Sequence, residues 1–385
     1  MRVNKKNSSH PYVSTIVFFF SILYMSQSLA TITCNKFSVP VQTEILNLGG
    51  VTTIGPDAEN GTVLFSMEYT ASKFPVEYTC YSDSLSEETL ITPIISAYTS
   101  TPKPLTTGSS GFYPGYVYDT GVPGVGVLFT LGTSSAPVLP GNTWYFHTSR
   151  LSRYSGYVTA FYLTKAQMKL IKTGPITPGI INGVNLPTLS VVASQSTPAN
   201  AIFPYVMQYI KFSGQITVAS KSCTTPDVTV NMGTHPIASS FSGIGSTTPW
   251  VDSSINLIDC PNFTGSIAGT FKGSTWTAGT GNKNSISVKL APSTSIIDNS
   301  NGVFSLSNAG LPGVASGVGI QLAYGDSKST SSLTMVNFLE SKNIVLDSGD
   351  GTGIKIPFAS RYIQTSSDIT PGVANGLATF IITYK

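Results

Sequence analysis

The sequence has 385 residues, of which 41% are hydrophobic and only 10% are charged, and its formal net charge at pH 7 is +3. So small a charge, with basic residues scattered singly, argues against a nucleic-acid-binding protein. No stretch shows the 3.6-residue apolar period of a helix, whereas Gly, Thr, Ser and Val are frequent. The composition therefore predicts an all-β fold, and the length suits two β-sandwich domains.

Residues 1–30 have the organisation of a secretory signal peptide. A basic start at residues 2–6 is followed by a short apolar core at residues 15–25 and a small-x-small cleavage site at residues 28–30. The core is too short for a membrane-spanning helix, which needs about 20 apolar residues. We expect an exported, soluble protein whose mature chain begins at Thr31.

The four cysteines fall into two pairs, Cys34 with Cys80 and Cys223 with Cys260. Four cysteines allow three connectivities, but only nearest-neighbour pairing keeps each bridge within one domain. Oxidation is expected after export, and each closed loop would stabilise its domain by about 3–4 kcal/mol. A zinc site is the competing idea, and the spacing argues against it because no CxxC occurs and the His residues are isolated. We predict two disulfides, no metal and no cofactor.

The expected first domain, residues 31–212, has short alternating strands and two candidate ligand-binding clusters. Glycan-binding proteins without metal commonly use carboxylates and amides for the sugar hydroxyls, and aromatic rings for the sugar faces. In the first cluster Tyr81 and Asp83 follow the second cysteine. The second cluster, in a loop-rich stretch, contains Tyr116, Asp119, Trp144 and Arg150. In the alternative interpretation, Trp144 is a core residue and Arg150 is exposed to solvent.

The expected second domain comprises residues 213–385. Residues 205–212 predict a strand that closes the first domain, and Ser213-Gly214 is expected to break it. Short alternating strands follow, among them residues 266–271, with Gly, Asn, Ser and Asp between them. This pattern again predicts a sandwich.

The last residues of the chain alternate with a period of two. The side chains on one face are those of Ala378, Phe380, Ile382 and Tyr384. Both faces carry apolar or β-branched residues, which predicts a strand that is not an exposed edge. We expect another strand beside it, supplied in one interpretation by a different protein. In the alternative, this is an ordinary last strand of a complete sandwich.

This ending resembles that of pilus subunits assembled by the chaperone–usher pathway. In that family Tyr stands next to last and a Gly stands fourteenth from the end, as do Tyr384, before the final Lys385, and Gly372 here. Residues 359–365 resemble the family's preceding strand, and residues 222–233 resemble the opening of the pilin domain in two-domain tip adhesins. The resemblance implies an immunoglobulin-like sandwich without its final strand. A periplasmic chaperone, an outer-membrane usher and the next fimbrial subunit would be its partners.

In the expected mature chain only residues 31–33 precede Cys34. A donated strand needs about ten residues at ~3.3 Å each, so we expect this subunit to accept a strand and to have none to give. Such a subunit resembles the tip adhesins of type 1 and type 3 fimbriae. The resemblance implies a jelly-roll or immunoglobulin-like receptor-binding domain at the fimbrial tip on a Gram-negative cell, with a host glycan or an extracellular-matrix protein as receptor. In mannose-specific members an Asn-Asp pair follows the corresponding Cys. Asp83 matches the Asp and Ser82 departs from the Asn, which puts mannose specificity in doubt.

No nucleophile elbow, phosphate-binding loop or H-E-x-x-H motif occurs. The scattered carboxylates of a glycosidase need no local motif, so that class stays open at this stage. The hypothesis is a non-enzymatic fimbrial tip adhesin. The alternative is a structural minor subunit or assembly initiator that binds no receptor.

Overall fold

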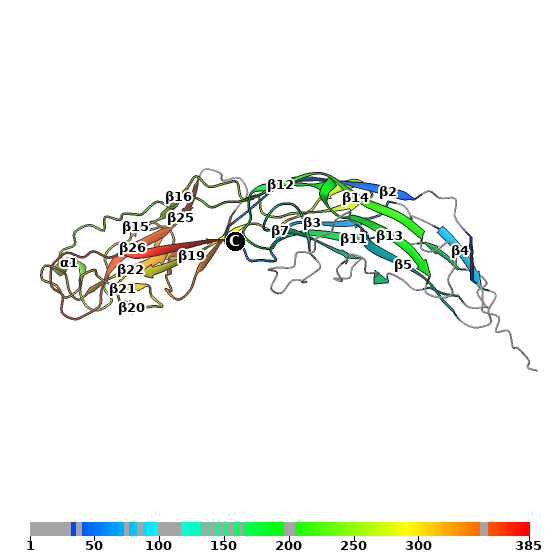
Figure 1. The fold of residues 1–385 in the computed structure, drawn as a ribbon. Coiled ribbons are helices and arrows are strands. Elements are labelled where there is room, and N and C mark those ends of the chain that lie inside the picture. Colours follow the sequence, from blue (N-terminus) through cyan, green and yellow to red (C-terminus); the bar gives the residue numbers. More distant parts are fainter. Residues whose placement is uncertain are drawn as a thin grey trace, which may run out of the picture.

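The structure, a computed structural model, describes residues 32–35, 41–72, 77–82, 88–98, 117–131, 138, 144–145, 149–151, 158–161, 165–195, 205–346 and 353–385. The predicted signal peptide lies outside these ranges. The described residues form 27 strands, two short 3-10 turns and one four-residue helix, which confirms the all-β prediction. The molecule is elongated, with two lobes and the C-terminus between them (Figure 1). No helix of the described ranges is long and apolar enough to cross a membrane.

The N-terminal lobe is built on two large sheets. The first contains, in spatial order, β18 (Thr275–Ala278), β17 (Ile267–Lys272), β3 (Val63–Thr70), β11 (Lys165–Lys172), β7 (Val125–Leu131) and β6 (Val117–Asp119). The second contains β12 (Gly179–Asn182), β14 (Tyr205–Ser220), β13 (Thr188–Gln195), β5 (Glu88–Tyr98) and β8 (Trp144–Tyr145), with β2 (Gln42–Ile54) paired to β14 and β9 (Ser149–Leu151) paired to β5. The turn η1 (Gly183–Asn185) precedes β13.

A third, small sheet contains β1 (Ile32–Asn35), β4 (Glu77–Ser82) and β10 (Val158–Phe161). The antiparallel register of β1 and β4 places Cys34 opposite Cys80. Only the backbone of these strands is described, so the Cys34–Cys80 disulfide stays a prediction.

Apolar side chains of the two large sheets pack into one closed core. Phe129 of β7 stacks on Phe212 of β14, with ring centroids 5.6 Å apart, so the sheets face each other. The buried hydroxyl of Tyr118 donates a hydrogen bond to the carbonyl of Val138 over 2.9 Å. Only three partly buried hydrophobic side chains are packed against this core among the described residues. The N-terminal lobe is therefore well filled where it is described.

The expected strand break at Ser213-Gly214 is wrong. β14 continues through these residues to Ser220, and all of β2 pairs in parallel with Gln208–Ser220 of β14. Gly214 explains the continuity, since its φ of 75° is accessible to glycine and a side chain there would collide with the carbonyl of Leu48. The division of the chain at residue 213 itself stays a prediction.

The expectation that residues 266–271 belong to the second domain's sandwich is also wrong. β17, which covers this stretch, pairs in parallel with β3 of the N-terminal lobe, and β18 folds back beside it. Phe271 is 2% exposed within the N-terminal core. Trp276 stacks on Phe65 of β3, with centroids 5.9 Å apart. A hairpin from the later half of the chain therefore completes the core of the earlier half.

The C-terminal lobe contains three smaller sheets. The first contains β15 (Val251–Asp252), β26 (Phe358–Gln364), β22 (Val318–Tyr324), β21 (Val303–Ser305) and β20 (Ile296–Asp298), with β23 (Thr334–Met335) paired to β22. The second contains β16 (Ile255–Ile258) and β25 (Gly353–Ile356), and the third contains β24 (Lys342–Val345), β19 (Ser285–Pro292) and β27 (Ala378–Tyr384). The helix α1 (Ile237–Ser240) and the turn η2 (Thr330–Ser332) lie outside the sheets.

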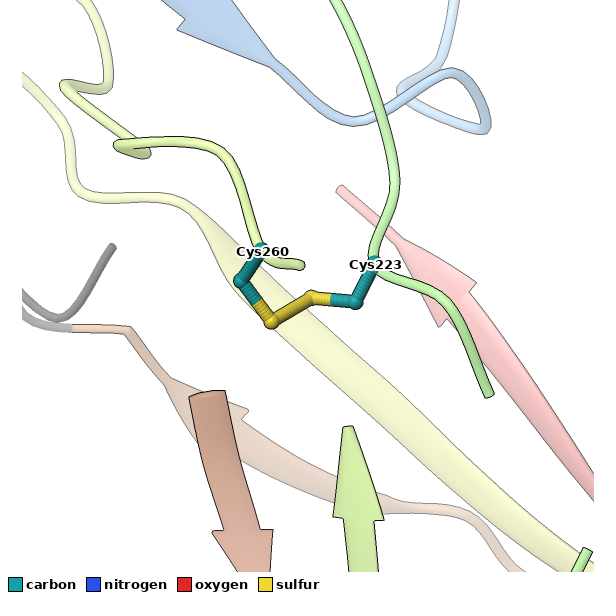
Figure 2. The surroundings of a disulfide bond; sticks show 2 residues. All are labelled: Cys223 and Cys260. Carbon is teal, nitrogen blue, oxygen red and sulfur yellow. A yellow bond between two sulfur atoms is a disulfide. The ribbon is translucent and has the colours of Figure 1, made fainter. Parts of the chain in front are cut away.

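The predicted Cys223–Cys260 disulfide is confirmed. It joins the segment after β14 to the segment after β16 and closes a sequence separation of 37 residues (Figure 2). Both cysteines are buried in the core of the C-terminal lobe. The bridge therefore fixes the chain where it leaves the N-terminal lobe.

Candidate functional site

β27 has the alternation predicted for the last strand. The side chains that face the core are those of Ala378, Phe380, Ile382 and Tyr384. On the opposite face Thr379 and Ile381 are exposed. The preceding strand is also confirmed, since β26 covers nearly all of residues 359–365.

One edge of β27 pairs antiparallel with β19, and no described residue pairs with its other edge. Lys385 and Ser285 exchange two backbone hydrogen bonds, over 2.8 and 2.9 Å. In an antiparallel ladder such pairs alternate with pairs whose N–H and C=O groups point away from the partner. The outward-pointing groups of β27 are therefore those of Ala378, Phe380, Ile382 and Tyr384. They form a row of peptide groups that a further strand would pair with.

A groove with a volume of about 920 Å³ runs beside this edge. Its lining includes residues 227–235 and residues 369–378 with Phe380, so it reaches the start of β27. Its floor is apolar and consists of side chains from several strands, among them Ile255, Leu290, Phe304, Val318, Ile320 and Phe358. Thirteen partly buried hydrophobic side chains are packed against the core of this lobe in the described part of the chain. Among them Ala378, Phe380 and Tyr362 also line the groove, so the C-terminal core is open on the groove side.

Two glycines allow the segment before β27 to lie close to the floor. A Cβ at Gly372 would lie 2.5 Å from backbone atoms of Val314 and Ala315, closer than any real side chain approaches. A Cβ at Gly376 would meet the side chain of Ile320. Gly372, singled out from the resemblance, is therefore required by backbone packing.

Tyr362 of β26 lies across the groove between its two sides. Its hydroxyl donates to the carbonyl of Ala374 over 2.7 Å, and its ring makes an edge contact with His235, with centroids 5.9 Å apart. Burial raises the pKa of Tyr362 above its ordinary value. Asp227 and His235 are the only Asp, Glu, Lys, Arg or His residues in the described lining. The groove suits an apolar partner.

The sequence itself identifies what kind of protein carries this groove. Residues 210–385 match the model of the fimbrial protein family. "Fimbrial subunit type 1" of Salmonella typhimurium is 31% identical over 199 residues, which cover 51% of this chain and 90% of that protein. The chain belongs to the fimbrial protein family. This membership confirms the prediction of a non-enzymatic protein.

Solved structures resemble this fimbrial protein at low similarity, two of them over most of its length. The CupB6 tip adhesin of Pseudomonas aeruginosa has 15% identity and a TM-score of 0.31, covering 92% of this chain and 94% of that one. CfaE, the adhesive subunit of CFA/I fimbria of enterotoxigenic Escherichia coli, has 10% identity and a TM-score of 0.23, covering 90% and 98%. The P pilus rod subunit PapA has 16% identity and a TM-score of 0.30, covering 43% and 100%.

Five of the six ligand-binding residues predicted in the N-terminal lobe have side chains that the structure does not describe. Asp83 and Tyr116 fall outside the described ranges. The backbone is described for the other aromatic and basic candidates: Tyr81 lies in β4, whereas Trp144 and Arg150 both lie on strands that pair with β5. These candidates stay predictions.

Asp119 is the one candidate whose side chain is described. It is exposed at the end of β6, and its carboxylate accepts a hydrogen bond from the N–H of Gly121 over 2.8 Å. This contact shapes the turn into β7. The described ranges contain no group of three His, Cys, Asp or Glu side chains placed to hold a metal ion.

Sequence reasoning missed Asp57, whose carboxylate accepts a hydrogen bond from the backbone N–H of Tyr384 over 2.9 Å. The two residues are 327 positions apart, and no local motif marks either one as the other's partner. The contact joins the two lobes at the end of β27.

Proposed function

We propose that this fimbrial protein is the tip adhesin of a chaperone–usher fimbria. Its C-terminal lobe joins the fimbria by accepting a β-strand from a chaperone and then from the next subunit. Its N-terminal lobe binds a receptor on the host surface, either a glycan or a matrix glycoprotein. The observation that carries the proposal is the unpaired edge of β27 beside an open apolar groove. An added strand would pair with that edge and place alternate side chains in the groove.

The energetics favour a strand from another polypeptide. The outward groups of β27 need hydrogen-bond partners once the groove is covered, because a buried peptide group without a partner costs about 1–3 kcal/mol. The apolar floor gains about 25 cal/mol for each Å² that is removed from water. A strand with alternating apolar residues satisfies both requirements together.

The receptor-binding part of the proposal is supported by the size and the closed core of the N-terminal lobe. The C-terminal groove does not include the core of that lobe, and the candidate residues Asp83, Tyr116 and Trp144 belong to the same part of the chain. Because β17 and β18 complete this lobe, an isolated fragment of residues 31–212 lacks part of its core. Receptor experiments therefore need the full mature chain.

Strand acceptance is tested by refolding the mature chain with and without a peptide of about ten residues that alternates Val and Thr. We expect the peptide to raise both the yield of soluble, folded protein and its thermal midpoint. The variant Ile320→Arg, which places a charge on the groove floor, should not respond to the peptide, whereas Ile297→Arg, on a half-exposed site, should respond normally. Equal folding of the wild type without any peptide would contradict the proposal.

The peptide-completed protein is then applied to panels of glycans and host matrix proteins. Binding that is lost in Asp83→Ala or Trp144→Ala would assign the receptor site to the N-terminal lobe. Strand acceptance together with no binding on either panel would favour a structural minor subunit.

A further inference from the structure

A short turn of the N-terminal lobe, residues 55–58, abuts the end of β27. We propose that this turn, which we call the edge stop, ends the acceptor edge and fixes the register in which the incoming strand of the next subunit pairs. The inference rests on the proposed function of β27 as a strand acceptor. It assigns to the N-terminal lobe a part in assembly, in addition to receptor binding.

The first observation is a hydrogen bond. The N–H of Tyr384 belongs to the outward-pointing row of β27, so an added strand would be its natural partner. In this chain the carboxylate of Asp57 already accepts that hydrogen bond, over 2.9 Å. The outward groups left for an added strand are those of Ala378, Phe380 and Ile382.

The second observation is steric. A Cβ at Gly55 would collide with the carbonyl carbon, the carbonyl oxygen and the Cβ of Tyr384. The main chain of the edge stop therefore lies directly against Tyr384. No space remains at this position for the backbone of another strand.

The edge stop is held firmly by the N-terminal sheet. Lys172, at the end of β11, is 5% exposed, and its ammonium group donates to the carbonyls of Pro56 and Ala58 over 2.7 and 2.5 Å. The N–H of Ala58 also donates to the carbonyl of Gly55, over 3.3 Å. A turn anchored to a central strand can resist an incoming chain.

The side-chain pattern alone does not fix this register. A slip of one residue turns every side chain of a strand to the opposite face, so the apolar groove rejects it. A slip of two residues keeps the same side chains pointing inward, and the apolar floor of the groove discriminates weakly against it. A physical end to the edge excludes every register that is shifted toward the lobe junction.

The test uses the mature chain, a Val-Thr repeat peptide of about 15 residues and amide hydrogen exchange read at single residues. The peptide has no preferred register, since every two-residue shift gives the same contacts. Exchange at Tyr384 is compared with exchange at Lys385. The N–H of Lys385 donates to the carbonyl of Ser285, so an added strand would not pair with it. The variant that removes the edge stop is Asp57→Ala combined with Lys172→Met. The control is Asp57→Asn, whose amide oxygen still accepts the hydrogen bond.

In the wild type and in Asp57→Asn, we expect the peptide to slow exchange at Ile382 and to change exchange at Tyr384 less than about twofold. In the double variant, Tyr384 should exchange rapidly without peptide, and the peptide should slow it about tenfold, as one or two gained backbone hydrogen bonds would do. Should the double variant not fold, the Asp57→Ala single variant tests the steric part of the inference. Its Tyr384 should exchange rapidly, and the peptide should slow that exchange less than about twofold, because the main chain of the edge stop stays in place. Equal peptide effects at Tyr384 in the wild type and in the double variant, or a strong peptide effect there in Asp57→Ala, would overturn the inference. Failure of the peptide to slow Ile382 in the wild type would instead overturn the proposed function.

Discussion

Phe271 tests whether the hairpin of β17 and β18 is an integral part of the N-terminal lobe. Its side chain is 2% exposed, and its ring lies 4.8 Å from that of Trp276, centroid to centroid. Truncation of a fully buried Phe removes its transfer free energy and leaves a cavity, at a cost of about 3–5 kcal/mol. We expect Phe271→Ala to lower the free energy of unfolding of the N-terminal lobe by this amount, although the residue lies beyond residue 213 in sequence.

The assay is guanidinium unfolding of the full chain with a bound strand peptide, together with amide exchange along β3. The matched control is Thr270→Ala, on the adjacent, exposed position of the same strand, which should change stability by less than about 0.5 kcal/mol. Faster exchange along β3 in Phe271→Ala alone would support the parallel pairing of β17 with β3. Unchanged exchange along β3, with the loss confined to the C-terminal lobe, would refute the reasoning.

Three further predictions concern single contacts. Replacing Cys223 and Cys260 by Ser opens a loop of 37 residues and should cost about 4 kcal/mol under the chain-entropy relation, read from denaturant unfolding with and without reductant. Gly372→Ala forces a Cβ to within 2.5 Å of neighbouring backbone atoms and should cost about 1–3 kcal/mol, whereas Gly174→Ala, with no atom within 4 Å, should be neutral or slightly stabilising in the same thermal scan. Burial raises the pKa of Tyr118 above its ordinary 10.0. The unfolded chain therefore releases this proton first, and stability present below about pH 10 is lost as the pH rises. Tyr118→Phe should show a smaller loss of stability as the pH rises above about 10, and equal losses would contradict the assignment.

The last strand was predictable because its information is local. The alternation from Ala378 to Tyr384 fixes which side chains point inward, whatever lies beside the strand. Gly372 was found through the resemblance, and the structure supplies its reason in the approach of the backbone at Val314 and Ala315. The Cys223–Cys260 bridge followed from spacing and export alone.

The contacts between the lobes were not predictable, because they join residues far apart in sequence. The apolar pattern of residues 266–271 indicates a strand but not the sheet that it enters, and its partner β3 lies some 200 residues earlier. Ser213-Gly214 has the composition of a strand end. Only the close approach of Leu48 on the neighbouring strand β2 shows why a glycine lies within β14 at this position. No sequence motif near Asp57 indicates its contact with Tyr384.

The most direct measurement of the central claim is residue-resolved amide exchange along β27, in the full chain with and without the Val-Thr peptide. Thr379, Ile381 and Thr383 pair with β19 and should be protected in both states. The amides of Ala378, Phe380 and Ile382 should exchange rapidly in the free chain and become protected only when the peptide is bound. Protection of all six amides in the free chain, or no change on adding peptide, would contradict the account of β27 as a strand acceptor.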